Sequence, residues 1–537
     1  MDNTFGKLIS DDLRLTGHRA NLTGAQHQHI IYPRDPAPGK SVELFLATAS
    51  DPAIERAELR YTTDGADPRA GGDSARTLAF RSARREWDSL LWDYVTYWSV
   101  AIPGQASGTM VTYCISAFTN AGEIIHADYP DAEERVQHAA MIHFGNIPAD
   151  APFTPSPQTS APLFCYHVDH DKPPAWSRDA IIYHIFLDRF YPGDGDDWIQ
   201  TGDMQDFCGG TLWGVRDKLD YLSELGVNCL WLSPVWQSPT THGYDVVDYD
   251  RIEPRLGGDE ALHAVVEGAH QRGIRVLLDF VPNHLSNQHP VFLDALSSAS
   301  SPYRDWFKFD ERFPHGYECF FTVKTMPKIN LEKPAARDWM IGNAIRQLEV
   351  FDVDGFRLDV AAGAGVNFWT HCRPWLRAVK PECLLIGEII DAPDVLRRYD
   401  GRLDGCLDFS MNDALRNTYA WETWDERRLD AFVGSHRAYF GDNFILPSFL
   451  DNHDMDRFSH IAENDNVRLK RAAAKQMSLP NPPIVFYGTE VGLCQPLSTR
   501  HHNLDVCRVP MVWDERQDLD LLAFYKDLIR QRRLSKL

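Results

Sequence analysis

In the last two thirds of the chain, short apolar runs alternate with segments of helical periodicity, and this alternation constrains the fold more than any other feature. The eight runs are AIIYHIF (180–186), VNCLWLS (227–233), IRVLLDFV (274–281), GFRLDV (355–360), LLIGEI (384–389), GCLDFSM (405–411), ILPSFLD (445–451) and PIVFYG (483–488). Strands that are buried on both faces need no polar alternation, so these runs are typical of a parallel sheet covered by helices. Eight strand–helix units predict an α/β fold with a (β/α)8 TIM barrel over residues 176–537.

The rest of the chain follows other patterns. Residues 1–145 contain short apolar segments separated by turn signals, which predict an N-terminal β-sandwich. Residues 146–175 are rich in proline and lack periodicity, so we expect a linker there. The long stretch 285–335 follows the third barrel run, and a loop of that length predicts an inserted subdomain with a functional role. Because these segments account for the whole sequence, we expect no C-terminal β-domain after the barrel.

Composition excludes several classes of function. Lys and Arg number 54 against 76 Asp and Glu, a formal net charge of −22, whereas a nucleic-acid binder needs a basic surface. No apolar run is long enough to span a membrane. Ten cysteines occur without a CxxC pair, and the N-terminus lacks the basic and apolar regions of a signal peptide. These features predict a cytoplasmic protein with free thiols.

Charged side chains follow several of the apolar runs, at the strand ends where barrel active sites lie. Arg357 and Asp359 belong to the fourth run, Glu388 to the fifth, and Asp454 follows the seventh. Arg357 and Asp359 are two residues apart and share a strand face, so the guanidinium should hold the carboxylate ionised. Glu388 precedes two isoleucines and suits a raised pKa. One ionised nucleophile and one protonated acid are what glycoside hydrolysis requires.

The motifs around these residues resemble the α-amylase superfamily, glycoside hydrolase family 13. DFVPNH (279–284), GFRLD (355–359), GE (387–388) and FLDNHD (449–454) are similar to its four conserved regions. YECFF (317–321) and MPKIN (326–330) resemble stretches of the neopullulanase, cyclomaltodextrinase and maltogenic amylase subgroup. The resemblance covers about residues 176–534.

The resemblance implies roles for individual residues. Asp359 would be the nucleophile, Glu388 the general acid/base, and Asp454 the third carboxylate, which binds sugar hydroxyls. The implied substrate contacts are Tyr244, His284, Arg357, His453, Phe320 and Phe321. Such enzymes retain anomeric configuration. We therefore expect a retaining hydrolase of α-1,4 bonds in cyclodextrins, maltooligosaccharides, pullulan or starch, with an α-glucan oligosaccharide as its partner.

The sequence departs from the family in the second region. The family continues with Lys-His or Asn-Glu, whereas this chain has Ala362 and Gly363. Losing these side chains would open the acceptor side of the site, unless neighbouring loops refill the space. The change keeps a transglycosylase or isomerase open as an alternative function. A catalytically silent carbohydrate-binding protein is the alternative from another class.

The remaining expectations from the sequence concern metal binding and the assembly of the chain into a dimer. Lys328 replaces a family calcium ligand beside Asn283, so we expect no calcium there. Asp194, Asp196 and Asp197 form an oxygen-rich turn that is either a calcium (Ca2+) site or a solvated acidic turn. The chemistry itself requires no cofactor. The N-terminal region resembles a domain that packs over a partner's active site in the subgroup, which implies a homodimer.

Overall fold

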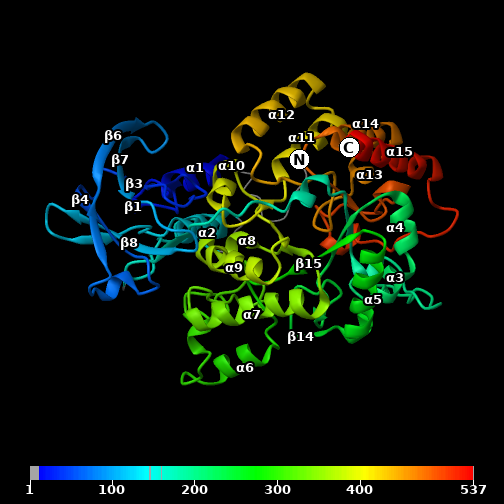
Figure 1. The fold of residues 1–537 in the computed structure, drawn as a ribbon, viewed down its shortest axis with the longest axis horizontal. Helices are drawn as coiled ribbons and strands as arrows, with labels where there is room; N and C mark the ends of the chain where they lie inside the picture. The colour runs from blue at the N-terminus through cyan, green and yellow to red at the C-terminus, as the bar shows by residue number, and fades with distance from the viewer. Residues whose placement is uncertain (1–10, 144–146, 159, 536–537) are drawn as a thin grey trace. The chain divides into compact units, whose positions relative to one another are not determined.

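The computed structural model describes residues 11–143, 147–158 and 160–535, which form two compact units (Figure 1). The first contains the described residues up to Asp171 together with Arg397–Arg402, and the second contains Lys172–Leu396 and the residues from Leu403 onward. None of the helices in the described ranges is long and apolar enough to cross a membrane.

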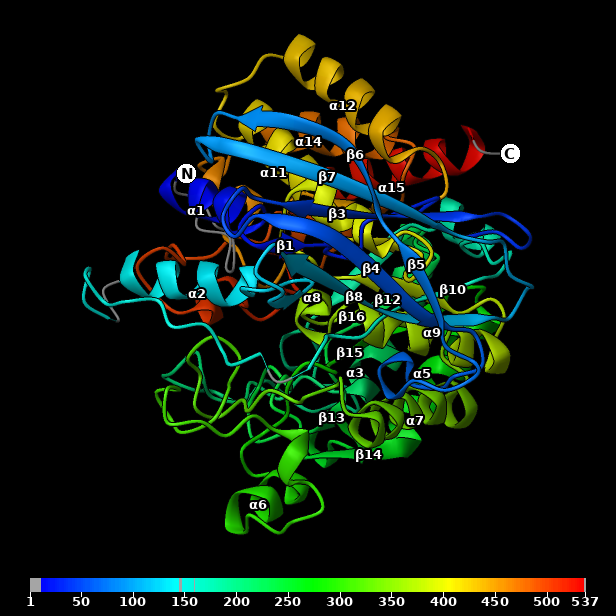
Figure 2. The same ribbon diagram turned by 90° about the vertical axis from the view of Figure 1, so that its left-hand side faces the viewer.

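The N-terminal unit consists of two five-stranded antiparallel sheets, seen from one side in Figure 2. One has the order β1-β3-β7-β6 with β2 on β3, and the other β10-β8-β4-β5 with β9 on β8. The strands are β1 (Ala25–Gln26), β2 (Ile31–Tyr32), β3 (Val42–Thr48), β4 (Ile54–Thr62), β5 (Arg76–Ala79), β6 (Arg81–Asp88), β7 (Asp93–Ile102), β8 (Met110–Thr119), β9 (Ile124–His126) and β10 (Phe164–His167). Alternate residues of β3 are buried, and residues from both sheets share one apolar core, as in a sandwich.

Two features of this unit differ from the sequence reading. The helices α1 (Asp11–Ala20) and α2 (Ala132–His143) lie in a region that we read as strands and turns. Residues 146–175, predicted to be a linker, include strand β10, which pairs with β8. The unit therefore extends to Asp171.

The second unit is built on one curled sheet of eight parallel strands, and each predicted apolar run contains one of them. The strands are β11 (Ile182–Ile185), β12 (Cys229–Leu232), β15 (Arg275–Phe280), β16 (Gly355–Leu358), β17 (Leu384–Gly387), β18 (Gly405–Cys406), β19 (Ser448–Phe449) and β20 (Pro483–Phe486). Their order is β18-β17-β16-β15-β12-β11-β20-β19. A parallel bridge between Gly405 and Ile445 links the segments at the two ends of that order.

Helices follow the strands. They are α3 (Leu212–Asp217), α4 (Leu219–Leu225), α5 (Gly258–Gln271), α6 (Pro290–Ser297), α7 (Pro334–Phe351), α8 (Ala361–Ala364), α9 (Val366–Val379), α10 (Pro393–Leu396), α11 (Phe409–Tyr419), α12 (Glu426–Phe440), α13 (Phe458–Ile461), α14 (Asn466–Ser478) and α15 (Leu519–Ser535). Of these, α6 lies apart from the sheet, beyond α7 (Figure 1). In α5 the buried residues Leu262, Val265, Val266 and Ala269 recur at helical spacing, so one apolar stripe faces the core.

Between β15 and α7, the predicted insertion contains α6 and three isolated β-bridges, one of them between His284 and Lys328. A short antiparallel pair of β13 (Trp236–Gln237) and β14 (Asp248–Ile252) precedes α5. Both segments follow carboxyl ends of the parallel strands, so they border the edge of the sheet where the charged residues gather.

Candidate active site

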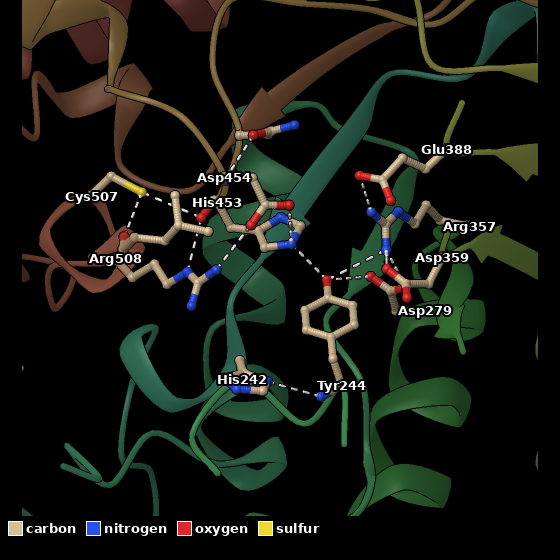
Figure 3. A network of polar contacts seen from close by, with 12 residues as sticks. His242, Tyr244, Asp279, Arg357, Asp359, Glu388, His453, Asp454, Cys507 and Arg508 are labelled. Carbon is tan, nitrogen blue, oxygen red and sulfur yellow. Dashed lines mark hydrogen bonds and ion pairs between the residues drawn. The ribbon is translucent and has the colours of Figure 1, made fainter. Parts of the chain in front are cut away.

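One guanidinium organises the charged residues at the carboxyl ends of the central strands. Arg357 lies in β16, and its Nη1 donates to Asp279 Oδ1 at 2.6 Å and to Asp359 Oδ1 at 2.9 Å. Its Nη2 lies 2.5 Å from Glu388 Oε1. These carboxylates come from β15, the end of β16 and the end of β17, and parallel register brings them to one level. Figure 3 shows the three carboxyl groups around Arg357.

A tyrosine hydroxyl connects this group to a second one. Tyr244 donates to Asp279 Oδ2 at 2.9 Å, and its oxygen lies 2.6 Å from His453 Nε2. The Tyr244 and His453 rings are stacked, 7° from parallel. In Figure 3 the hydroxyl lies between the Arg357 cluster and His453. The resemblance assigned Tyr244 only a contact with the substrate, so the sequence did not indicate this bridge.

The second group is centred on another arginine, which sequence reasoning missed. Arg508 Nη2 donates to Asp454 Oδ1 at 2.9 Å, and its Nε donates to the carbonyl oxygen of His453 at 2.9 Å. Its Nη1 donates to Asp505 Oδ1 at 3.1 Å. Asp454 Oδ2 also lies 3.1 Å from His453 Nε2. The third carboxylate is therefore held on two sides, by Arg508 and by His453 (Figure 3).

Burial dominates the electrostatics of the two principal carboxyl groups. Burial raises the pKa of Glu388 above its ordinary value, against the lowering effect of Arg357. Burial also raises the pKa of Asp359, and the nearby charges of Glu388, Asp279 and Asp454 add to that rise. We expected Arg357 to hold Asp359 ionised. The guanidinium lowers its pKa as predicted, but three carboxylates share one cation and desolvation outweighs it.

The backbone after the nucleophile candidate has an unusual conformation. Val360 has φ 42° and ψ 50°, in the left-handed region that β-branched residues rarely adopt. Its N–H donates to Glu388 Oε2 at 3.2 Å, while the N–H of Asp359 continues the sheet by donating to the carbonyl oxygen of Phe280. The left-handed turn thus directs one backbone donor at the carboxyl group that the sequence identifies as the acid.

His284 and its neighbours form a further side of the site. Asn283 Nδ2 lies 3.1 Å from His284 Nδ1. Because an amide nitrogen can only donate, Nδ1 accepts and the proton of a neutral His284 is on Nε2. Burial lowers the pKa of His284 to about 3, so the imidazole is neutral. Its ring stacks on Phe320, and Phe320 contacts Phe321 edge to face; Phe321 is exposed.

Gly363 has a different neighbourhood from the open acceptor side that we expected. A Cβ atom on Gly363 would lie 2.3 Å from Asn283 Oδ1 and 3.1 Å from Val360 Cγ1. No side chain fits there unless Asn283 moves. The loss of the family's polar residue is therefore matched by an asparagine amide that occupies the space, which is the refilling alternative.

The candidate metal ligands do not come together. Asp194 is paired with Arg216 at 2.7 Å, and the ammonium of Lys328 is paired with Glu318 at 3.2 Å. Among the described residues there is no group of three or more His, Cys, Asp or Glu side chains that could hold a metal ion. A carboxylate bonded to a guanidinium is a poor calcium ligand, so the residues of this turn do not fit the ion.

Fold and site together define a class of protein. A curled parallel sheet with paired carboxyl groups, an arginine and histidines at its carboxyl edge has the architecture of barrel glycosidases. Residues 184–521 match the family profile of the alpha amylase catalytic domain. The chain belongs to the alpha-amylase family.

Named relatives give the same result. The chain is 37% identical over 370 residues to Alpha-amylase 2 of Dictyoglomus thermophilum, covering 68% of this chain and 65% of the relative. It is 32% identical over 385 residues to an intracellular maltogenic amylase of Bacillus subtilis, covering 69% and 64%. A solved cyclomaltodextrinase structure is similar with a TM-score of 0.64 and 27% identity, over 95% of this chain and 84% of that one. The chain thus spans slightly less than two thirds of the length of the first two relatives.

Proposed function

We propose that the chain is a retaining α-glucan hydrolase that cleaves α-1,4-glucosidic bonds through a covalent glycosyl-enzyme intermediate. The observation that carries the proposal is the Arg357 guanidinium, which forms ion pairs with both Asp359 and Glu388. Two carboxyl groups on one guanidinium lie close together, and a retaining mechanism needs a separation of about 5–5.5 Å. The names of the relatives favour cyclodextrins, maltooligosaccharides, pullulan or starch as substrates.

The proposed steps use groups already in place. Asp359, in the ionised form that Arg357 favours, attacks the anomeric carbon while Glu388 gives its proton to the leaving glycosidic oxygen. Glu388, now ionised, accepts a proton from the water that cleaves the Asp359–sugar bond. The raised pKa of Glu388 suits the first step, and the N–H of Val360 stabilises the ionised form in the second. We also propose that the curled sheet is a closed (β/α)8 barrel, which the Gly405–Ile445 bridge supports.

The test follows the products of β-cyclodextrin, pullulan and maltotriose by NMR. A retaining enzyme releases the α-anomer first, and Asp359→Asn and Glu388→Gln should each reduce turnover by orders of magnitude in a folded protein. Initial release of the β-anomer, or a near wild-type rate of Glu388→Gln on an unactivated glucan, would contradict the proposal. Longer oligosaccharides or new linkages among the products would favour transfer, and binding without turnover would favour the silent alternative.

We propose a cytoplasmic location and a homodimer as well. The relative named intracellular maltogenic amylase supports the location, and the subgroup resemblance of the N-terminal unit supports the dimer. Light scattering should give twice the monomer mass of 61.1 kDa. A single species at the monomer mass at all concentrations would refute the dimer.

A further inference from the structure

A histidine that the proposed mechanism does not use lies beneath the site. His184 is in β11, where it is in register with Trp231 of β12 and Phe486 of β20. Its imidazole is fully buried and stacks on the Trp231 indole, with ring centroids 3.6 Å apart and planes 5° from parallel. The ring of His453 lies edge to face with it, 5.0 Å away.

The nitrogens of His184 are the unusual feature. Neither ring nitrogen has a hydrogen-bond partner among the described residues, and burial keeps the pKa of His184 well below its ordinary value. The ring is therefore neutral, with one N–H donor and one bare nitrogen. An unpaired buried polar group costs stability, and a phenylalanine would fill the space without that cost. Such a group in a protein core calls for an explanation.

His453 also has a buried ring nitrogen that lacks a hydrogen-bond partner among the described residues. Tyr244 donates its hydroxyl hydrogen to Asp279, so the hydroxyl oxygen is left to accept from His453 Nε2. The Asp454 carboxylate beside the same nitrogen can only accept when it is ionised. Both neighbours thus place the proton of His453 on Nε2, and Nδ1 is left as a bare acceptor. Nδ1 is also buried and has no partner among the described residues.

His184 also contacts the other half of the site. The indole of Trp231, on which it stacks, donates from Nε1 to Asp279 Oδ2 at 3.1 Å. Asp279 in turn holds Arg357. The His184 ring therefore contacts both hydrogen-bonded groups. It stacks on Trp231, which is bonded to Asp279 in the Arg357 group, and it lies against His453, which neighbours Asp454 in the Arg508 group.

We propose that His184 is a positioning residue, whose N–H satisfies Nδ1 of His453 through one internal water molecule and so fixes the orientation of the His453 imidazole. Buried waters commonly join polar groups that lack a protein partner. With Nδ1 satisfied, Nε2–H faces Tyr244, Asp454 and the sugar in one fixed orientation. The inference rests on the proposed glycosidase function only for its kinetic consequence, because the hydrogen bond to Nδ1 is a property of the free protein.

The experiment compares His184→Phe, which keeps the ring and removes both nitrogens, with His184→Gln, which keeps a donor and an acceptor. We expect the kcat of the folded Phe variant on maltotriose to fall about tenfold or more, the loss of one hydrogen bond to a catalytic-site group. The Gln variant should recover most of that loss. His436 is the matched control, since it is buried in the same unit but paired with Asp408 at 3.1 Å. His436→Phe should melt lower and leave the kcat of the folded protein unchanged.

The 15N NMR signals of the histidines give a readout that does not need catalysis. In the wild-type protein the signals of His453, assigned with His453→Gln, should show protonated Nε2 and an unprotonated Nδ1 that accepts a hydrogen bond, and His184→Phe should shift the Nδ1 signal toward that of an unbonded nitrogen. A wild-type kcat with an unchanged His453 Nδ1 signal in His184→Phe would overturn the inference. If the Phe variant does not fold, a His184→Gln protein with a wild-type melting temperature and a tenfold lower kcat would also overturn it. An Nδ1 signal that changes as expected in His184→Phe, in a protein with no turnover on any α-glucan, would refute the proposed function and leave the inference standing.

Discussion

Removal of one hydroxyl group tests whether Tyr244 joins the two halves of the active site. The change Tyr244→Phe keeps the ring, which stacks on His453, and therefore keeps any stacking contact with a sugar. It removes the bond to Asp279 at 2.9 Å and the contact with His453 at 2.6 Å. The effect of the variant thus comes from the bridge alone.

The size of the effect follows from the partners of the hydroxyl. A hydrogen bond to a charged group contributes roughly 1.5–3 kcal/mol, and Asp279 keeps two other donors, Arg357 and Trp231, so the fold persists. If the bridge holds the geometry of the transition state, that energy corresponds to a fall in kcat/KM of about 10- to 150-fold, since each 1.36 kcal/mol is a factor of ten.

The assay is the initial rate of maltotriose hydrolysis, measured alongside thermal melting. Tyr249→Phe is the control, because its hydroxyl is also buried but donates to the backbone carbonyl of Val281 at 2.6 Å. That variant should lose stability and keep its kcat/KM. A Tyr244→Phe enzyme with wild-type kcat/KM would show that the two groups work independently, and the reasoning would fail.

Three further predictions concern the same edge of the sheet. Arg508→Lys keeps the charge but cannot bond Asp454 and two other oxygens at once, so kcat/KM should fall roughly 10- to 100-fold by ion-pair loss; unchanged kinetics would show that Asp454 needs no guanidinium. Gly363→Ala should lower the free energy of unfolding in urea by about 1–3 kcal/mol, because its Cβ would meet Asn283 Oδ1 at 2.3 Å; an equal value would mean that this amide rotates freely. Burial raises the pKa of Glu388 above its ordinary value of 4.5. The free energy of unfolding therefore falls as pH rises from 4.5 through the folded pKa, because ionising the buried carboxyl group costs free energy in the folded protein. Glu388→Gln should therefore melt higher than wild type at pH 8 but not at pH 4, and equal differences at both would contradict the sign.

The sequence was most informative where a property is local. Each of the eight strands lies in a largely apolar run. Asp359 and Glu388 lie near the ends of two such runs and Asp454 lies shortly after a third, so burial and position in the chain could be predicted from the sequence. Parallel strands then place their ends on one edge, which explains why three distant carboxylates could be grouped in advance.

What the sequence did not indicate depends on long-range contacts. Arg508 lies 54 residues from Asp454, within a loop that carries no periodic signal, and only the folded chain brings them together. Strand β10 has only four residues within a proline-rich stretch, and these residues form a strand because they pair with β8. Their own sequence therefore did not predict it. The expected opening at Gly363 failed for the same reason, since the space belongs to Asn283, 80 positions earlier in the chain.

The left-handed conformation of Val360 has a consequence for the order in which the molecule assembles and comes apart. A β-branched residue in this region costs on the order of 1–3 kcal/mol, and the bond from its N–H to Glu388, which follows β17, offsets that cost only after the neighbouring strands are in place. The turn that directs an N–H at Glu388 is therefore among the last parts to form and the first to relax on heating. We expect catalytic competence to disappear a few degrees before the sheet melts, so that thermal inactivation of the enzyme is a local event at one peptide unit rather than a collapse of the fold.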